Sequence, residues 1–155
     1  MKRIVWNMVA VAFSTLFFLS APASADDKEA AVKMVKSCAA FYKANGMEKT
    51  LDAINDLKGE FVKGELYVAA LSFDGTLMAK GFGQNQVGQN TMDVPDAKGK
   101  KFRREKIERA QKDGSGWVDY VFVNPKTKEL EDKMSYFEKV DELVLTVGIY
   151  SGKSK

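Results

Sequence analysis

Two short segments of this sequence combine the side chains that a small anion needs for binding. Such a site needs a fixed positive charge, one or two hydroxyl or amide donors, and an apolar wall that excludes water. Lys133 can supply the charge, Trp117 can supply the wall, and nearby tyrosine and serine residues can donate hydrogen bonds. The candidate ligand-binding residues are Tyr67, Trp117, Tyr120, Lys133, Ser135 and Tyr136.

Strand geometry limits how many of these side chains one site can hold, because alternate residues of a strand point to opposite faces. Lys133 and Ser135 share one face, whereas Tyr136 points to the other. Trp117 and Tyr120 also have opposite parity. The alternative role of these residues is structural, because aromatic side chains on strands often pack in the core and an edge-strand lysine can be solvated.

The composition excludes most catalytic chemistry. The chain has no histidine and one cysteine, which rules out histidine-dependent nucleophiles, histidine-ligated zinc, a c-type haem, an intrachain disulfide and a CxxC redox pair. Asp119 with Glu129 or Glu131 is the available acid/base pair, but no nucleophile motif or metal cluster accompanies it. The sequence therefore predicts that the protein is not an enzyme and has no metal and no cofactor.

The N-terminal segment has the pattern of a secretory signal peptide. Lys2 and Arg3 precede a mostly apolar run, Ile4–Leu19, and small residues form an A-x-A-like cleavage site. We expect cleavage after Ala25 and a periplasmic mature chain, residues 26–155, without a membrane span; the alternative is an uncleaved anchor. Loss of this peptide leaves 22 basic and 21 acidic side chains. That balance argues against a nucleic-acid partner.

The elements that position these residues follow from apolar periodicity. Spacings of three and four predict a long helix near residues 28–44, with Val32, Val35 and Ala39 against a sheet. A short helix is expected over Met47–Asn55, and the charged segment Lys101–Lys112 is expected to be a surface helix. The expected strands are Glu65–Phe73, Thr76–Lys80, Trp117–Val123, Leu130–Val140 and Leu143–Tyr150.

Short turns between consecutive strands predict an antiparallel five-stranded sheet in a single α+β domain. Leu143–Tyr150 is nearly continuous in apolar residues, so it is expected to be the central strand. Short helices and the polar segment Gly81–Asp96 are expected to cover the face opposite the long helix.

Several motifs, taken in order, resemble the single Cache domains, which are extracytoplasmic relatives of PAS folds. The motifs are Phe73-Asp74-Gly75-Thr76, Gln86–Asn90 (L-V-G-K-N), Lys98–Phe102 (D-G-K-x-F), Gly114–Tyr120 (G-x-G-W-V-D-Y), Asn124–Thr127 (N-P-x-T), Lys133–Tyr136 (K-x-S-Y) and Val147–Tyr150. The sequence departs from many relatives at Ala79-Lys80-Gly81, where they carry A-H-P. An ammonium group therefore replaces a polar ring near the expected pocket.

The resemblance implies a PAS-like sensor module that binds a small ligand, often a short carboxylate, between its sheet and a covering loop. Such domains usually belong to a chemoreceptor or kinase, and we expect this chain to act as a free periplasmic module that captures a ligand or signals to a membrane receptor or kinase. The alternative is a non-catalytic interaction or structural protein that uses the fold without a ligand. A pocket filled by Phe82 or Met92 would favour that alternative.

Overall fold

The computed structural model describes residues 24–153, so the expected signal peptide, residues 1–25, lies outside the described residues except for its last two. None of the helices within residues 24–153 is long and apolar enough to cross a membrane. The elements are α1 (Ala25–Asn45), α2 (Met47–Asn55), β1 (Val62–Lys63), β2 (Leu66–Ser72), β3 (Leu77–Lys80), the 3-10 helix η1 (Gln84–Gln86), α3 (Phe102–Asp113), β4 (Ser115–Val123), β5 (Leu130–Val140) and β6 (Leu143–Lys153).

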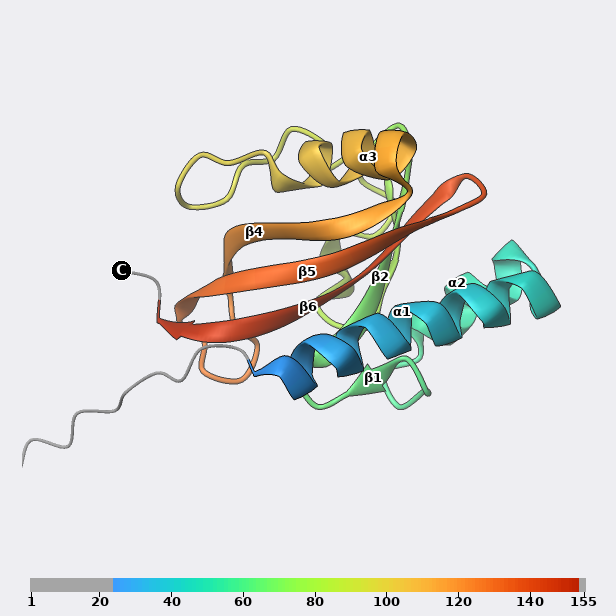
Figure 1. The fold of residues 1–155 in the computed structure, drawn as a ribbon, viewed down its shortest axis with the longest axis horizontal. Helices are drawn as coiled ribbons and strands as arrows, with labels where there is room; N and C mark the ends of the chain where they lie inside the picture. The colour runs from blue at the N-terminus through green and yellow to red at the C-terminus, as the bar shows by residue number, and fades with distance from the viewer. Residues whose placement is uncertain (1–23, 154–155) are drawn as a thin grey trace, which may run out of the picture.

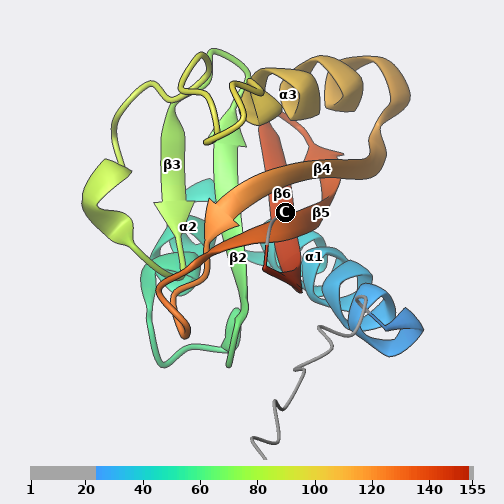
Figure 2. The ribbon, with the colours of Figure 1, turned by 90° about the vertical axis from the view of Figure 1, so that its left-hand side faces the viewer.

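The strands form an antiparallel sheet that is covered by helices on both faces (Figures 1 and 2). β6 lies between β2 and β5, and β4 forms the edge beyond β5. At the other side, β2 pairs with β3 and also with the two-residue β1. The predicted α+β fold is therefore confirmed, and so is the predicted central position of the last strand. β1 is too short to produce a periodic pattern in the sequence.

α1 covers one face of the sheet and begins at a capping box. The Ser24 hydroxyl accepts a hydrogen bond from the Asp27 backbone N–H, and the Asp27 carboxylate accepts one from the Ser24 backbone N–H, both at 3.2 Å. The predicted apolar stripe is displaced at its first position, because Ala31 is buried and Val32 is only half-buried. The buried residues of the helix are Ala31, Met34, Val35, Cys38 and Ala39, and they join the core under β2 and β6.

α3 covers the opposite face, and the segment between β3 and α3 lies beside it (Figure 2). Phe102 and Ile107 of the helix pack in one cluster with residues of β2, β4, β5 and β6. Val87 and Met92 of the preceding segment contact the edge of the same cluster. The helix, rather than the expected loop, therefore forms most of this layer.

The expectation that α3 is a surface helix is wrong for two of its charged residues. Arg103 is 6% exposed and Lys106 is 2% exposed. Residues three and four apart share a helix face, so both side chains lie on the face that carries Phe102 and Ile107. The helix thus turns two positive charges toward the sheet.

β4 is an edge strand whose outward backbone groups are bonded by side chains. Arg109 Nη1 and Lys100 Nζ each donate to a carbonyl oxygen of the strand at 2.6 Å, and the Asp96 carboxylate accepts from a strand N–H at 2.9 Å. The bonded residues alternate along the strand, as an antiparallel ladder requires, and are Trp117, Asp119 and Val121. These bonds block addition of another strand and fix α3 against the sheet.

Candidate functional site

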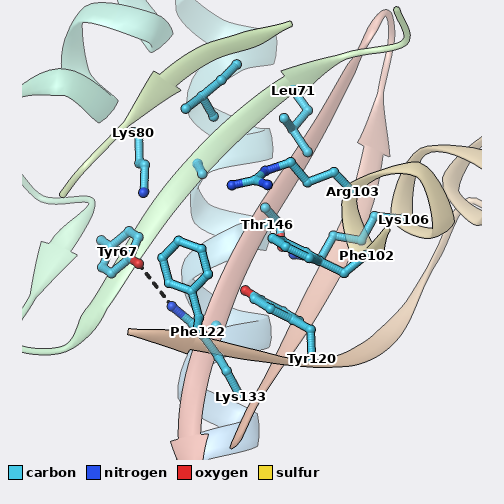
Figure 3. Close-up of a pocket in the computed structure, with 13 residues that line it drawn as sticks. Tyr67, Leu71, Lys80, Phe102, Arg103, Lys106, Tyr120, Phe122, Lys133 and Thr146 are labelled. Carbon is cyan, nitrogen blue, oxygen red and sulfur yellow. Dashed lines mark hydrogen bonds between the residues drawn. The ribbon is translucent and has the colours of Figure 1, made fainter. Parts of the chain in front are cut away.

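A cavity of about 50 Å³ lies between α3 and the sheet. Figure 3 shows side chains from both layers converging on it, with the amine ends of Lys80 and Lys133 and the Arg103 guanidinium directed inward. The basic and aromatic side chains of the wall are Tyr67, Lys80, Phe102, Arg103, Lys106, Tyr120, Phe122 and Lys133. The cavity therefore combines four basic groups with four aromatic rings.

Lys133 reaches this cavity from β5 by passing over β6 at Gly148. A Cβ atom at Gly148 would overlap the Lys133 side chain, so the glycine provides the room that the lysine stem occupies. Lys133 Nζ donates to the hydroxyls of Tyr67 at 3.0 Å and Tyr150 at 2.9 Å. Burial, and next the nearby positive charge of Lys80, lowers the pKa of Lys133 well below its usual value.

Arg103 and Lys106 enter the cavity from α3 and lie against the Phe102 ring. The Arg103 guanidinium carbon is 4.4 Å from the ring centroid, and Lys106 Nζ is 5.1 Å from it. Arg103 Nη1 is buried without a hydrogen-bond partner among the described residues. Burial, followed by the charges of Lys133 and Arg103, lowers the pKa of Lys106 well below its usual value. Both groups are desolvated, and neither forms an ion pair within the described residues.

Lys80 contributes a fourth basic group from the end of β3. Its Nζ lies 5.2 Å from the Phe122 ring centroid and 5.9 Å from that of Tyr67. The Asn55 side-chain oxygen accepts from the Lys80 backbone N–H at 3.0 Å, which fixes the residue at the cavity wall. Burial, and then the charge of Arg103, lowers the pKa of Lys80 from 10.5 to about 8.

The described part of the chain provides no acidic partner for these four groups. None of its ion pairs within 4.0 Å includes any of them. Two carboxylates act on these lysines from a distance, and both bind other residues. Glu65 accepts a hydrogen bond from Asn124 at 2.8 Å, and Glu105 forms an ion pair with Lys100 at 3.0 Å. Burying positive charge without a partner is costly, so the arrangement favours an anion in the cavity.

A wider, more open depression of about 520 Å³ adjoins the cavity and shares Tyr120 and Lys133 with it. Its other charged side chains balance in sign, with three lysines and three aspartates: Lys28, Lys98, Lys100, Asp96, Asp119 and Asp132. Lys98 and Asp132 form an ion pair at 3.5 Å. The attraction for an anion is therefore concentrated in the smaller cavity.

Three of the six candidate ligand-binding residues line the cavity, namely Tyr67, Tyr120 and Lys133. Tyr120 and Lys133 are direct partners in the β4–β5 register, so they point to the same face. Ser135 is 1% exposed on that face, and its hydroxyl lies beside that of Tyr120. Burial raises the pKa of the Tyr120 hydroxyl, which keeps it protonated and able to donate.

Trp117 and Tyr136 do not reach the cavity. They pack on the α1 face of the sheet, where their ring centroids are 5.5 Å apart and Lys28 Nζ lies 5.9 Å from the Trp117 ring. Strand alternation sends them to the opposite face from Tyr120 and Lys133, so they are not part of this cavity wall.

The sequence interpretation missed Arg103, Lys106 and the rings of Phe102 and Phe122. Basic residues in a charged helix are usually solvated, so apolar periodicity alone assigns them to the surface. The available signal was their spacing, because Arg103 and Lys106 are three residues apart and lie between Phe102 and Ile107, which share their helix face.

Comparisons with known proteins identify the family and the fold. The sequence profile of the Single Cache domain 2 family matches residues 28–153. No curated protein matches the sequence. Among solved structures, a methyl-accepting chemotaxis protein from Vibrio parahaemolyticus is similar, with 18% sequence identity, a TM-score of 0.69, and coverage of 81% of this chain and 88% of that one.

Two further structures have the same fold. A Cache chemosensory domain described in terms of carboxylic acid recognition has 19% identity and a TM-score of 0.69, with coverage of 82% of this chain and 95% of that one. The periplasmic sensor domain of a chemotaxis protein has 21% identity and a TM-score of 0.63, with coverage of 80% and 90%. At these identities the structures establish the shared fold.

Proposed function

The chain belongs to the Single Cache domain 2 family of non-catalytic, extracytoplasmic sensor domains, and from that premise we propose that it binds a small organic acid in the cavity between α3 and the sheet. The observation that carries the proposal is the set of four buried basic groups without an acidic partner in residues 24–153. An anion would replace the water that each group loses on burial. One of the similar structures is a Cache domain described as recognising carboxylic acids, which supports this ligand class.

Lys133, Tyr67 and Tyr120 form the core of the proposed site. Lys133 supplies a charge that the Tyr67 and Tyr150 hydroxyls hold in position, and Tyr120 supplies a donor. The small volume, about 50 Å³, favours a ligand with few heavy atoms. Ser135 is buried on the same face as Lys133, and we propose it as a second donor.

A ligand-free interaction protein is the alternative function. The feature expected to favour it is a cavity filled by Phe82 or Met92. Phe82 is 41% exposed, and neither residue belongs to the cavity wall. This observation supports ligand binding.

For the cellular setting, we propose export through a signal peptide at residues 1–25 and a sensor module, residues 26–155, in the periplasm. The bound state would be read by a membrane receptor or kinase, or the module would capture its ligand. Mass spectrometry of protein recovered from the periplasm is expected to find Asp26 as the first residue. An intact chain recovered from the membrane would contradict this proposal.

Binding is tested with the mature chain in a thermal-shift screen against formate, acetate, propionate, lactate, malonate and succinate, followed by calorimetry. A ligand at a hundred times its dissociation constant is expected to stabilise the protein by about 2.7 kcal/mol.

Lys133→Met is expected to abolish binding, because it removes the charge and keeps an unbranched stem. Lys139→Met is the matched control, since this lysine is exposed on the same strand. Equal binding by the Lys133 variant and the parent would exclude the site.

A further inference from the structure

We propose that the ligand is a short dicarboxylate, with one carboxylate held by Lys80 and Lys133 and the other by Arg103 and Lys106. This inference rests on the proposed function, since it specifies the charge of the organic acid in the same cavity.

The first pair belongs to the sheet. Lys80 on β3 and Lys133 on β5 both lie over the rings of Tyr67 and Phe122. The distances from Nζ to the ring centroids are 5.9 and 5.2 Å for Lys80 and 4.6 and 5.6 Å for Lys133. The Tyr67 hydroxyl accepts from Lys133 Nζ at 3.0 Å. Two ammonium groups and a hydroxyl therefore surround the same part of the cavity.

The second pair belongs to α3. Arg103 and Lys106 both contact the Phe102 ring, and Lys106 Nζ is also 4.5 Å from the Tyr120 ring centroid. Phe102 and Tyr120 are stacked, with centroids 4.0 Å apart and an angle of 2° between their planes. Within residues 24–153, no ring is contacted by basic groups of both pairs. The two pairs therefore lie over different rings and come from different layers, and Phe122 of the first set is 6.1 Å from the ring centroids of Phe102 and Tyr120.

The second pair is prepared for an acceptor that the described chain does not supply. Arg103 Nη1 is fully buried and makes no hydrogen bond there. Leaving a buried donor unbonded is unfavourable, and more so when the donor is charged. A carboxylate oxygen accepts charge-assisted N–H bonds from a guanidinium, so it matches this unbonded donor.

Charge determines the number of carboxylates. A monocarboxylate at Lys80 and Lys133 would leave Arg103 and Lys106 buried without an anion. A second carboxylate on the same molecule compensates that pair without the entropic cost of binding another ligand. The cavity volume of about 50 Å³ restricts the spacer between the two groups to a very short one.

The experiment compares acids of equal carbon number by calorimetry on the mature chain: malonate with propionate and succinate with butyrate. Sulfate is included because it carries two charges on a single centre. At least one dicarboxylate is expected to bind about tenfold or more tightly than its monocarboxylate counterpart, because charge-assisted hydrogen bonds are gained.

Variants locate the second carboxylate. Lys106→Met and Arg103→Met are expected to remove the preference for the dicarboxylate and to leave affinity for the monocarboxylate within about threefold, since the sheet pair is intact. Lys112→Met is the matched control, because this lysine is exposed on the same helix. Circular dichroism confirms that each variant is folded. If Lys106→Met does not fold, Lys106→Gln replaces it.

The outcomes separate the two proposals. If monocarboxylates bind as tightly as their dicarboxylate counterparts, the organic-acid site stands and the dicarboxylate inference is overturned. Sulfate binding more tightly than every dicarboxylate also overturns the two-ended arrangement. If no organic acid binds, the proposed function fails and the inference fails with it.

Discussion

The Lys133 side chain occupies the space that a Cβ atom would take at Gly148. The lysine starts on β5 and must pass over the central strand β6 to place its amine against Tyr67 on β2. A strand interior usually disfavours glycine, because its conformational freedom is lost and it contributes no packing. Here the lack of a side chain at Gly148 leaves room for the stem of the buried Lys133. Gly148 therefore belongs to the site, although it has no side chain that could bind a ligand.

Gly148→Ala is therefore expected to weaken binding without unfolding the protein. The added methyl group displaces Lys133 from the Tyr67 and Tyr150 hydroxyls, and affinity for the organic acid is expected to fall about tenfold or more. Overpacking is expected to cost about 1–3 kcal/mol of unfolding free energy. Calorimetry measures the first effect and urea unfolding the second. Unchanged affinity in the alanine variant would mean that the Lys133 position is unimportant for binding.

Removing Lys106 is expected to stabilise the ligand-free protein. Its amine is desolvated and lies close to other basic groups, so Lys106→Met exchanges an unfavourable buried amine for an apolar side chain of similar length. The expected gain is about 1–3 kcal/mol of unfolding free energy, measured by urea denaturation without ligand. Lys112→Met on the exposed face is expected to change stability by less than about 0.5 kcal/mol. A large loss of stability in the Lys106 variant would indicate that the amine has a favourable internal partner.

The bonds on the outer edge of β4 give a prediction about the fold. Arg109→Met removes the guanidinium that donates to the Trp117 carbonyl at 2.6 Å. The expected cost is about 1–2 kcal/mol in urea unfolding, together with more self-association in light scattering, because an edge strand with open backbone groups can pair with another chain. Arg104→Met, which removes surface ion pairs to Asp93 and Glu108, is expected to cost less. Equal effects of the two variants would argue against edge protection by Arg109.

Local sequence patterns predicted the main elements because each pattern depends on neighbours along the chain. The buried stripe of α1 and the nearly continuous apolar run of β6 report directly which residues face a core. Strand parity also anticipated that Tyr120 and Trp117 could not share a site. The cavity depends instead on contacts between α3 and five strands, β2 to β6, which no local period encodes. Arg103 and Lys106 follow the ordinary pattern of a solvated helix in the sequence, and only the tertiary packing reverses their environment.

Binding of the organic acid is expected to take up protons and to weaken as pH rises. Lys80 has a pKa of about 8 in the empty cavity, and a bound anion raises it by favouring the charged amine. Below both pKa values the lysine is protonated with and without ligand, so affinity is maximal. Above the free-state value, the amine must gain a proton on binding, so affinity falls with increasing pH.

From pH 7 to 9, Lys80 alone is expected to reduce affinity about tenfold. Lys106 and Lys133 have pKa values lowered well below their usual value, so their contribution begins at lower pH and adds to the same trend. The hydroxyls of Tyr67 and Tyr120 stay protonated in this range, because burial raises their pKa values above 10. Short carboxylic acids are fully ionised throughout, so the ligand itself does not produce the change.

Calorimetry in two buffers of different ionisation enthalpy measures the number of protons taken up at each pH. Lys80→Met is expected to bind more weakly at pH 7 and to show a flatter decline toward pH 9, because one of the linked amines is absent. Lys139→Met, which alters an exposed amine outside the cavity, is expected to keep the full decline. An affinity independent of pH in the parent protein would mean that the cavity amines do not meet the bound anion, since no anion can contact them without raising their pKa values.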